Sequence, residues 1–201
     1  MAFSDYSSLE GEHASESSVK GSKFIGISMS CPDEASVSAN LSRAASMYPQ
    51  ATHYCYAAVF GGPDPVERFS DNGEPSGTAG RPILGVLRGS GLSDAMIVVV
   101  RYFGGTLLGT GGLVKAYTAS AEAALEGARV VVRRACAEFS LSLDYASFNS
   151  FQSRFSDILA ARPECEFSER VLVKARVPVQ KADEFSERVV SMTGGKVRAF
   201  R

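Results

Sequence analysis

The chain has 201 residues, of which 45% are hydrophobic and 21% are charged, the composition of a globular protein that can bury a core. Its 21 basic and 22 acidic side chains give a formal net charge of −1. This balance excludes a protein whose whole surface attracts nucleic acid, so any such contact requires a local basic patch. The length accommodates two modest domains or one larger domain.

Membrane, secretion and metal signals are weak in this sequence. The longest apolar run, residues 95–100, is strand-sized, whereas a membrane helix needs about 20 apolar residues. The N-terminus is polar and acidic, unlike a signal peptide. The four cysteines are widely spaced and include no CxxC pair, which argues against a zinc site and a disulfide scaffold. We therefore expect a cytoplasmic protein that contacts no membrane and uses no metal or cofactor.

The first part of the chain is predicted to alternate strands and helices. Residues 1–18, rich in serine, glutamate and glycine, are expected to form a partly mobile tail before a domain at 19–135. Hydrophobic periodicity and turn residues predict a strand at 24–30, a helix between Pro32 and Pro49, a strand at 52–60, a long loop at 71–80, a buried strand at 96–102 and a helix at 110–127.

The pattern changes after Arg134. Residues 139–145, 171–177 and 197–199 alternate as strands, a short strand is expected at 164–167, and helical stripes run over 148–159 and 182–192. This order is βαββαβ, the ferredoxin-like arrangement, so we predict a second domain at 138–201.

Two long segments carry a family resemblance. Residues 70–82 read SDNGEPSGTAGRP, and residues 100–117 read VRYFGGTLLGTGGLVKAY. Together with the segments at 20–24 and 51–53, they closely resemble the YigZ/IMPACT family over nearly the whole chain. One departure is Asn72, where that family usually has aspartate.

The resemblance implies an α+β fold. Its N-terminal α/β domain would be like the second domain of a small-subunit ribosomal protein, and a ferredoxin-like domain would follow, an order similar to the fourth and fifth domains of elongation factor G. The eukaryotic relatives regulate translation initiation through a kinase-activating partner and carry an extra N-terminal domain, in place of which this chain has a short tail. For the bacterial relatives the resemblance implies nucleic-acid binding, although a shared fold is weak grounds for a function.

The glycine-rich turn before the helix at 110–127 is the first candidate site. A helix start offers unpaired backbone N–H groups and a positive dipole end, so an anion such as a phosphate is its natural ligand. The alternative is a tight turn that needs glycine only for packing. The expected anion-binding residues are Arg81, Arg101, Gly104, Gly105, Gly109, Thr110, Gly111, Gly112 and Lys115.

Acidic and histidine side chains form a second candidate group. Asp71 and Glu74 could bind a cation or pair with Arg81 or Arg101. His53 lies two residues from Cys55 on one face of a strand and could polarise a ligand or serve as a hydrogen-bonded structural residue. No serine or cysteine has a recognisable nucleophile context, so we predict no catalytic residue and consider an enzyme the weaker hypothesis.

The second domain offers a third, weaker surface. If alternate apolar residues of its sheet face the helices, four basic residues point to the open face: Lys174, Arg176, Lys196 and Arg198. RNA-recognition modules use such a sheet, but they add aromatic stacking residues that are absent here. The alternative is a solvated sheet face.

These observations favour a binding protein directed at RNA or the ribosome, which would act as a translation regulator and could also contact a translation-associated protein. The alternatives are an enzyme that acts on a phosphorylated small molecule and a protein-binding adaptor.

Overall fold

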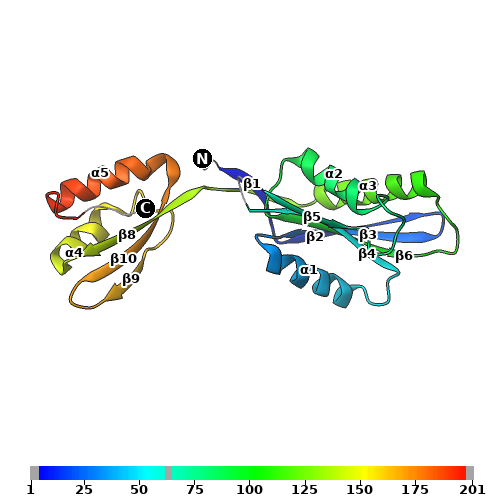
Figure 1. The fold of residues 1–201 in the computed structure, drawn as a ribbon, viewed down its shortest axis with the longest axis horizontal. Coiled ribbons are helices and arrows are strands. Elements are labelled where there is room, and N and C mark those ends of the chain that lie inside the picture. Colours follow the sequence, from blue (N-terminus) through cyan, green and yellow to red (C-terminus); the bar gives the residue numbers. More distant parts are fainter. Residues whose placement is uncertain (1–4, 62–64, 198–201) are drawn as a thin grey trace. The chain divides into compact units, whose positions relative to one another are not determined.

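The computed structural model describes residues 5–61 and 65–197 and has an α+β architecture. The chain divides into two compact units (Figure 1): one is Tyr6–Arg133, and the other is Arg134–Arg201 together with Met1–Asp5. Within the described ranges, no helix is long and apolar enough to cross a membrane.

A five-stranded antiparallel sheet forms the centre of the first unit, with the strand order β2-β3-β6-β4-β5. Its strands are β2 (Glu12–Val19), β3 (Ser22–Ser30), β4 (His53–Phe60), β5 (Val66–Ser70) and β6 (Ala95–Tyr102). Helix α1 (Glu34–Met47) covers one face, whereas α2 (Gly80–Ser90) and α3 (Thr110–Glu126) cover the other (Figure 1). Alternate residues of β6 enter the cores on opposite faces, so this strand is buried on both sides as its apolar run predicts.

The first residues of the chain differ from the expected tail. Residues 6–10 form β1 (Tyr6–Glu10), which pairs with β7 (Arg129–Arg133), and β2 pairs with β3 along its whole length. Most side chains of β2 are exposed or half-buried, because β2 lies at the edge of the sheet. An edge strand needs little apolar sequence when a neighbouring strand supplies its backbone partners, so composition alone was misleading.

Strand β5 and helix α2 were not predicted. The interior of α2 contains Gly85 and Gly89, two poor helix formers, and Pro82 lies in its first turn. Burial of Ile83, Leu84 and Leu87 against the sheet stabilises α2 despite this composition. Tertiary packing therefore outweighs local propensity here.

The second unit has a three-stranded antiparallel sheet with the order β8-β10-β9. Its elements are β8 (Cys136–Leu143), α4 (Tyr145–Arg154), β9 (Glu164–Phe167), β10 (Val171–Pro178), a short 3-10 turn at Val179–Lys181 and α5 (Ala182–Thr193). Alternate residues of β8 and β10 pack under the helices. These are the first five elements of the predicted ferredoxin-like domain. The predicted last strand falls mainly on residues 198 and 199, outside the described residues.

Candidate functional site

A cavity of about 430 Å³ lies beside the start of α3 in the first unit. It is lined by Thr52, His53, Glu74, Pro75, Arg101, Phe103, Leu107, Leu108, Gly109, Thr110 and Leu113. The fold thus brings together the 70–82 segment, the end of β6 and the first turn of α3. The volume is in the range of small-molecule and cofactor sites.

The glycines in and after the turn before α3 are required to different degrees and for different physical reasons. A Cβ on Gly104 would lie 2.0 Å from the carbonyl carbon of Gly21, so the close approach of two backbones requires glycine there. Gly109, the N-cap of α3, has φ 74°, which favours glycine. A Cβ on Gly111 would instead meet open space, and packing does not explain glycine at that position.

The start of α3 has no side-chain cap. The first intrahelical bond is donated by the Leu113 N–H to the Gly109 carbonyl. The N–H groups of residues 110–112 therefore have no intrahelical acceptor, and the helix dipole adds partial positive charge at the same place. This geometry can bind an anion or another acceptor that enters the cavity.

Arg101 is buried, with 4% of its surface exposed, and its charge is already paired. Nη1 donates to Glu74 Oε1 at 2.6 Å, and Nη2 donates to Ser22 Oγ at 3.2 Å. Among the described residues, Nε has no hydrogen-bond partner. Arg101 therefore differs from the free cation expected of an anion site: it is an internal counter-ion for Glu74 whose Nε has no partner among the described residues.

Glu74 is the centre of a small hydrogen-bonded network. Its Oε1 accepts from the Tyr117 hydroxyl at 2.7 Å, and His53 Nε2 lies 3.8 Å from the same oxygen. Cys55 Sγ in turn lies 3.3 Å from the Tyr117 hydroxyl. Burial raises the pKa of Cys55 to about 12 and also raises the pKa of Tyr117, so both groups stay protonated at neutral pH.

The carboxylate oxygens of Asp71 are occupied by backbone hydrogen bonds and are poorly available to a cation. Its carboxylate accepts from the N–H groups of Gly77, Ala79 and Gly80 at 2.8–2.9 Å, which caps the start of α2. Burial raises the pKa of Asp71, but these three bonds and the charge of Arg81 outweigh it, so the net pKa is lowered. Across the described residues, no group of three or more His, Cys, Asp or Glu side chains is arranged to hold a metal ion.

Asn72 and His53 fix the same loop to β4. The Asn72 side-chain oxygen accepts from the Tyr54 N–H at 2.7 Å, and its carbonyl lies 2.8 Å from His53 Nδ1. His53 is thus a hydrogen-bonded structural residue whose other ring nitrogen reaches the cavity. Aspartate at position 72 could accept the same bond, so the departure from the family pattern preserves the loop's anchor.

Two other expected anion ligands lie away from the cavity lining. Arg81 is exposed, with its guanidinium over the Phe69 ring at 5.7 Å, and Lys115 is exposed on α3. Of the expected set, Arg101, Gly109 and Thr110 line the cavity, whereas Gly104, Gly105, Gly111 and Gly112 belong to its surrounding turn and helix start.

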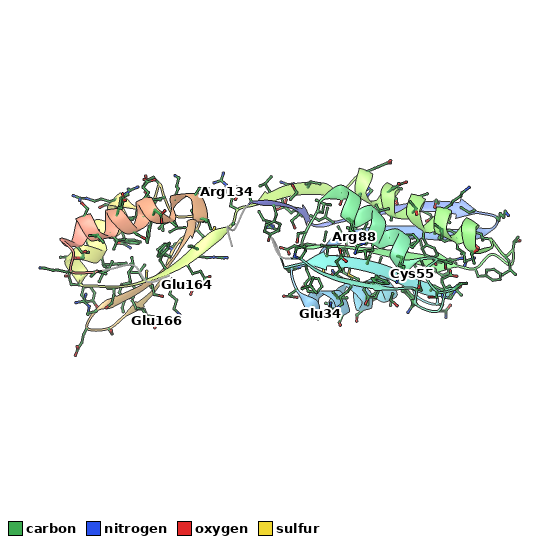
Figure 2. All side chains as sticks on the ribbon, turned by 45° about the horizontal axis from the view of Figure 1, so that its top comes forward. Glu34, Cys55, Arg88, Arg134, Glu164 and Glu166 are labelled. Carbon is green, nitrogen blue, oxygen red and sulfur yellow. The ribbon has the colours of Figure 1, made fainter. Side chains whose placement is uncertain are left out.

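Two of the basic residues expected on the open face of the second unit's sheet lie beside carboxylates. Lys174 Nζ lies 3.8 Å from Glu166, and Arg176 Nε lies 3.6 Å from Glu138. Glu164 stands opposite Lys174 in the β9–β10 register and shares this side of the sheet (Figure 2). The three glutamates offset the charge of the lysine and arginine, and Arg198 lies outside the described residues.

Sequence reasoning missed Phe103, Leu107 and Tyr117 as site residues. Phe103 is 45% exposed and Leu107 is 82% exposed, so both offer apolar surface at the cavity. Tyr117 was assigned to the core stripe of α3, and it does pack against Phe24. The available signal was its hydroxyl, since a tyrosine inside a buried stripe needs a polar partner.

Known proteins resemble this chain along most of its length. The family model of the Impact N-terminal domain matches residues 20–125. IMPACT family member YigZ of Escherichia coli is 34% identical over 182 residues, covering 90% of this chain and 89% of YigZ. IMPACT family member YvyE of Bacillus subtilis is 34% identical over 186 residues, covering 92% and 85%. A crystal structure of a hypothetical protein matches with a TM-score of 0.79 and 30% identity, covering 99% of this chain and 98% of that one. This chain therefore belongs to the IMPACT family.

Proposed function

We propose that this protein is a cytoplasmic component of translation control that binds single-stranded RNA, free or within the ribosome, through one nucleotide seated at the start of α3. The observation that carries the proposal is the shared cavity of an uncapped helix start and an exposed aromatic side chain, Phe103. Membership of the IMPACT family supports it.

Each part of a nucleotide has a complementary group in this cavity. A phosphate can accept from the free N–H groups of residues 110–112 and gains from the helix dipole. A base can stack on the ring of Phe103, an interaction that does not depend on base identity. Leu107 and Leu108 offer apolar contacts beside that ring.

The charge distribution favours a local and modest interaction. Arg68 and Arg88 are paired with Glu34 and Glu67, and Arg101 is paired with Glu74. Arg101 is the one lysine or arginine that lines the described cavity, and it is already paired. The log–log salt slope should therefore be about −0.7 to −1.4, since each single-strand phosphate contributes roughly −0.7.

The decisive test compares two aspartate substitutions in exposed helical glycines. Gly111→Asp places a negative charge in the first turn of α3. This charge interacts favourably with the helix dipole, so the helix should stay folded, but it repels a phosphate. Gly85→Asp is the matched control, because a Cβ at either position meets open space. We expect Gly111→Asp to abolish binding in RNA titrations and ribosome co-sedimentation and Gly85→Asp to bind as the parent does. Equal binding by both variants, or none by the parent, would remove the proposal.

A second candidate is an enzyme acting on a phosphorylated small molecule. The buried Glu74, held by Arg101 and Tyr117 at the cavity, is the observation that favours it. Incubating the protein with mixtures of mononucleotides and sugar phosphates, followed by mass spectrometry, tests this candidate. A product formed by the parent and lost in Glu74→Gln would favour the enzyme over the RNA-binding protein. Nuclease-insensitive association with a translation protein would instead support an adaptor.

A further inference from the structure

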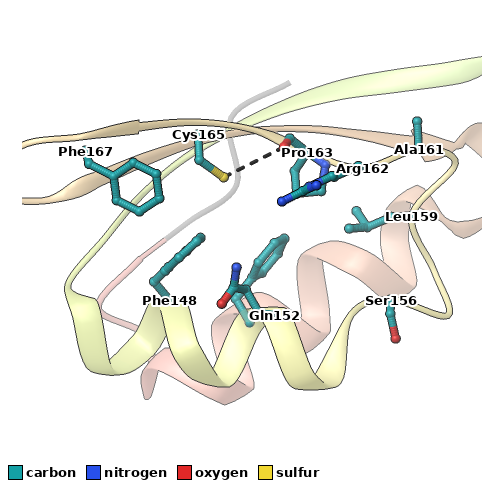
Figure 3. A pocket seen from close by; sticks show the side chains of 10 residues that line it. Phe148, Gln152, Ser156, Leu159, Ala161, Arg162, Pro163, Cys165 and Phe167 are labelled. Carbon is teal, nitrogen blue, oxygen red and sulfur yellow. Dashed lines mark hydrogen bonds between the residues drawn. The ribbon is translucent and has the colours of Figure 1, made fainter.

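A second cavity, of about 540 Å³, lies within the second unit between α4 and β9 (Figure 3). It is lined by Phe148, Phe151, Gln152, Ser156, Leu159, Ala161, Arg162, Pro163, Cys165 and Phe167. This volume is in the range of sites that enclose small organic ligands. Neither the RNA-binding proposal nor the family resemblance gives it a role.

Three aromatic side chains line this cavity: Phe148, Phe151 and Phe167. Phe148 and Phe167 meet edge to face with ring centroids 5.5 Å apart, and Phe151 stacks on Phe155 at 4.8 Å. Phe167 remains 62% exposed, although Val171, the residue opposite it on β10, is fully buried. A large ring that stays so exposed at the mouth of a cavity would gain from an apolar ligand that covers it.

One cation lies at this apolar cavity. Figure 3 shows the Arg162 side chain reaching over the cavity, between Cys165 and Leu159. Within the part of the chain that the structure describes, its guanidinium makes no hydrogen bond or carboxylate ion pair. No acidic side chain lines this cavity, although Arg162 also lines a smaller hollow with Glu138 and Glu164. Gln152 adds a neutral polar group on the α4 side.

We propose that this cavity binds a small apolar monocarboxylate, such as an aryl- or alkyl-substituted acid. The apolar part lies among Phe148, Phe151 and Phe167, and the carboxylate pairs with Arg162, whose planar guanidinium suits such a group. A polyanion fits poorly, because the remaining lining offers rings and aliphatic groups rather than further cations.

A peptide that adds a strand to β9 is the weaker occupant. β9 lies at the edge of the described sheet, but it has four residues, follows Pro163 and carries Glu164 and Glu166. Short edges with charges and proline are features that discourage strand addition. The cavity with its aromatic lining, and not the strand edge, is therefore the feature that recognises the ligand.

The test uses phenylbutyrate and its neutral analogue phenylbutanol as probes of the full chain. We expect phenylbutyrate to shift the amide NMR signals of residues in α4 and β9 and to bind about fivefold tighter than phenylbutanol. Arg162→Gln should erase this preference while leaving the alcohol's affinity unchanged. Arg176→Gln is the matched control, because Arg176 lies on the opposite side of the sheet, and it should retain the preference.

Cysteine protection gives an independent readout. Cys165 lines the cavity, whereas Cys136 is partly exposed outside its lining, so phenylbutyrate should slow alkylation of Cys165 and leave Cys136 unaffected. Phe167→Ala should weaken both probes. The proposal is wrong if neither probe shifts α4 and β9 signals, if both cysteines respond alike, or if Arg162→Gln keeps the preference for the acid.

Discussion

The two cavities hold their arginines in opposite states. Arg101 is buried in the first unit and bonded to Glu74, whereas Arg162 in the second unit is exposed and lacks a carboxylate partner within the described residues. Arg101 stands in a glycine-rich motif that suggests anion binding, yet its charge is neutralised by Glu74. Arg162 stands in no motif, yet no carboxylate is bonded to it within the described residues. The availability of a cation thus depends on its burial and its partner more than on neighbouring sequence.

The difference has an energetic side. A buried ion pair gains strong attraction but loses the hydration of both charges, so its net contribution to stability is small. Removing one partner leaves the other charge buried and unpaired, which is costly. An exposed arginine loses little hydration, and its removal affects the fold little. Replacing Arg101 should therefore lower the free energy of unfolding much more than replacing Arg162.

The largest effect is expected from Arg101→Met. This change leaves the Glu74 carboxylate buried without its cation and should lower the free energy of unfolding by about 3–5 kcal/mol. Urea unfolding followed by circular dichroism measures it. The double variant Arg101→Met, Glu74→Leu removes both charges and should recover most of the loss. A double variant as unstable as Arg101→Met would show that shape, and not charge pairing, dominates this position.

A smaller loss is expected from Asp71→Ala, which removes the carboxylate that caps α2. Caps of this kind stabilise by up to about 2 kcal/mol, and we expect a loss of that size in the same unfolding experiment. Ser76→Ala, in the same loop, is the control and should change stability by less than about 0.5 kcal/mol.

The cap should also make stability depend on pH. The pKa of Asp71 is lower in the folded protein than its ordinary value of 3.8, so its contribution is complete above that value and is lost as pH falls through the folded pKa. Unfolding midpoints measured from neutral pH down to about pH 3 should therefore fall more steeply for the parent than for Asp71→Asn. Parallel curves would contradict the role given to this carboxylate.

The smallest effect is expected from Arg162→Gln. Because Arg162 has no bonded partner in the described chain, its replacement should change the free energy of unfolding by less than about 0.5 kcal/mol. The same variant in the ligand experiment should lose the preference for the acid. A loss of stability comparable to that of Asp71→Ala would mean that Arg162 supports the fold.

Much of the fold followed from apolar periodicity. The double burial of β6 and the alternation of β8 and β10 were visible because each strand must match the surfaces that cover it. The β2 edge strand was missed because its stability comes from pairing with β3. Helix α2 was missed because Gly85 and Gly89 in its interior are poor helix formers.

The candidate site was only partly predictable. The glycine-rich helix start at Gly109 and Thr110 follows from local sequence, and the pairing of Glu74 with Arg101 was one alternative open at that stage. The bond from Tyr117 to Glu74 and the bond between Cys55 and Tyr117 join residues of α3, β4 and the 71–80 loop, which no local pattern reports. Likewise, the glutamates beside Lys174 and Arg176 became relevant only through strand register.

The two glycines inside α2 imply uneven protection from hydrogen exchange. Each lowers helix stability by about 1 kcal/mol relative to alanine, and a Cβ at either position would meet open space. Helix α2 should therefore open in brief local excursions while α3 and the central sheet stay closed, and its amides should exchange sooner than those of α3. The double variant Gly85→Ala, Gly89→Ala should slow that exchange in α2 and leave the exchange of α3 unchanged.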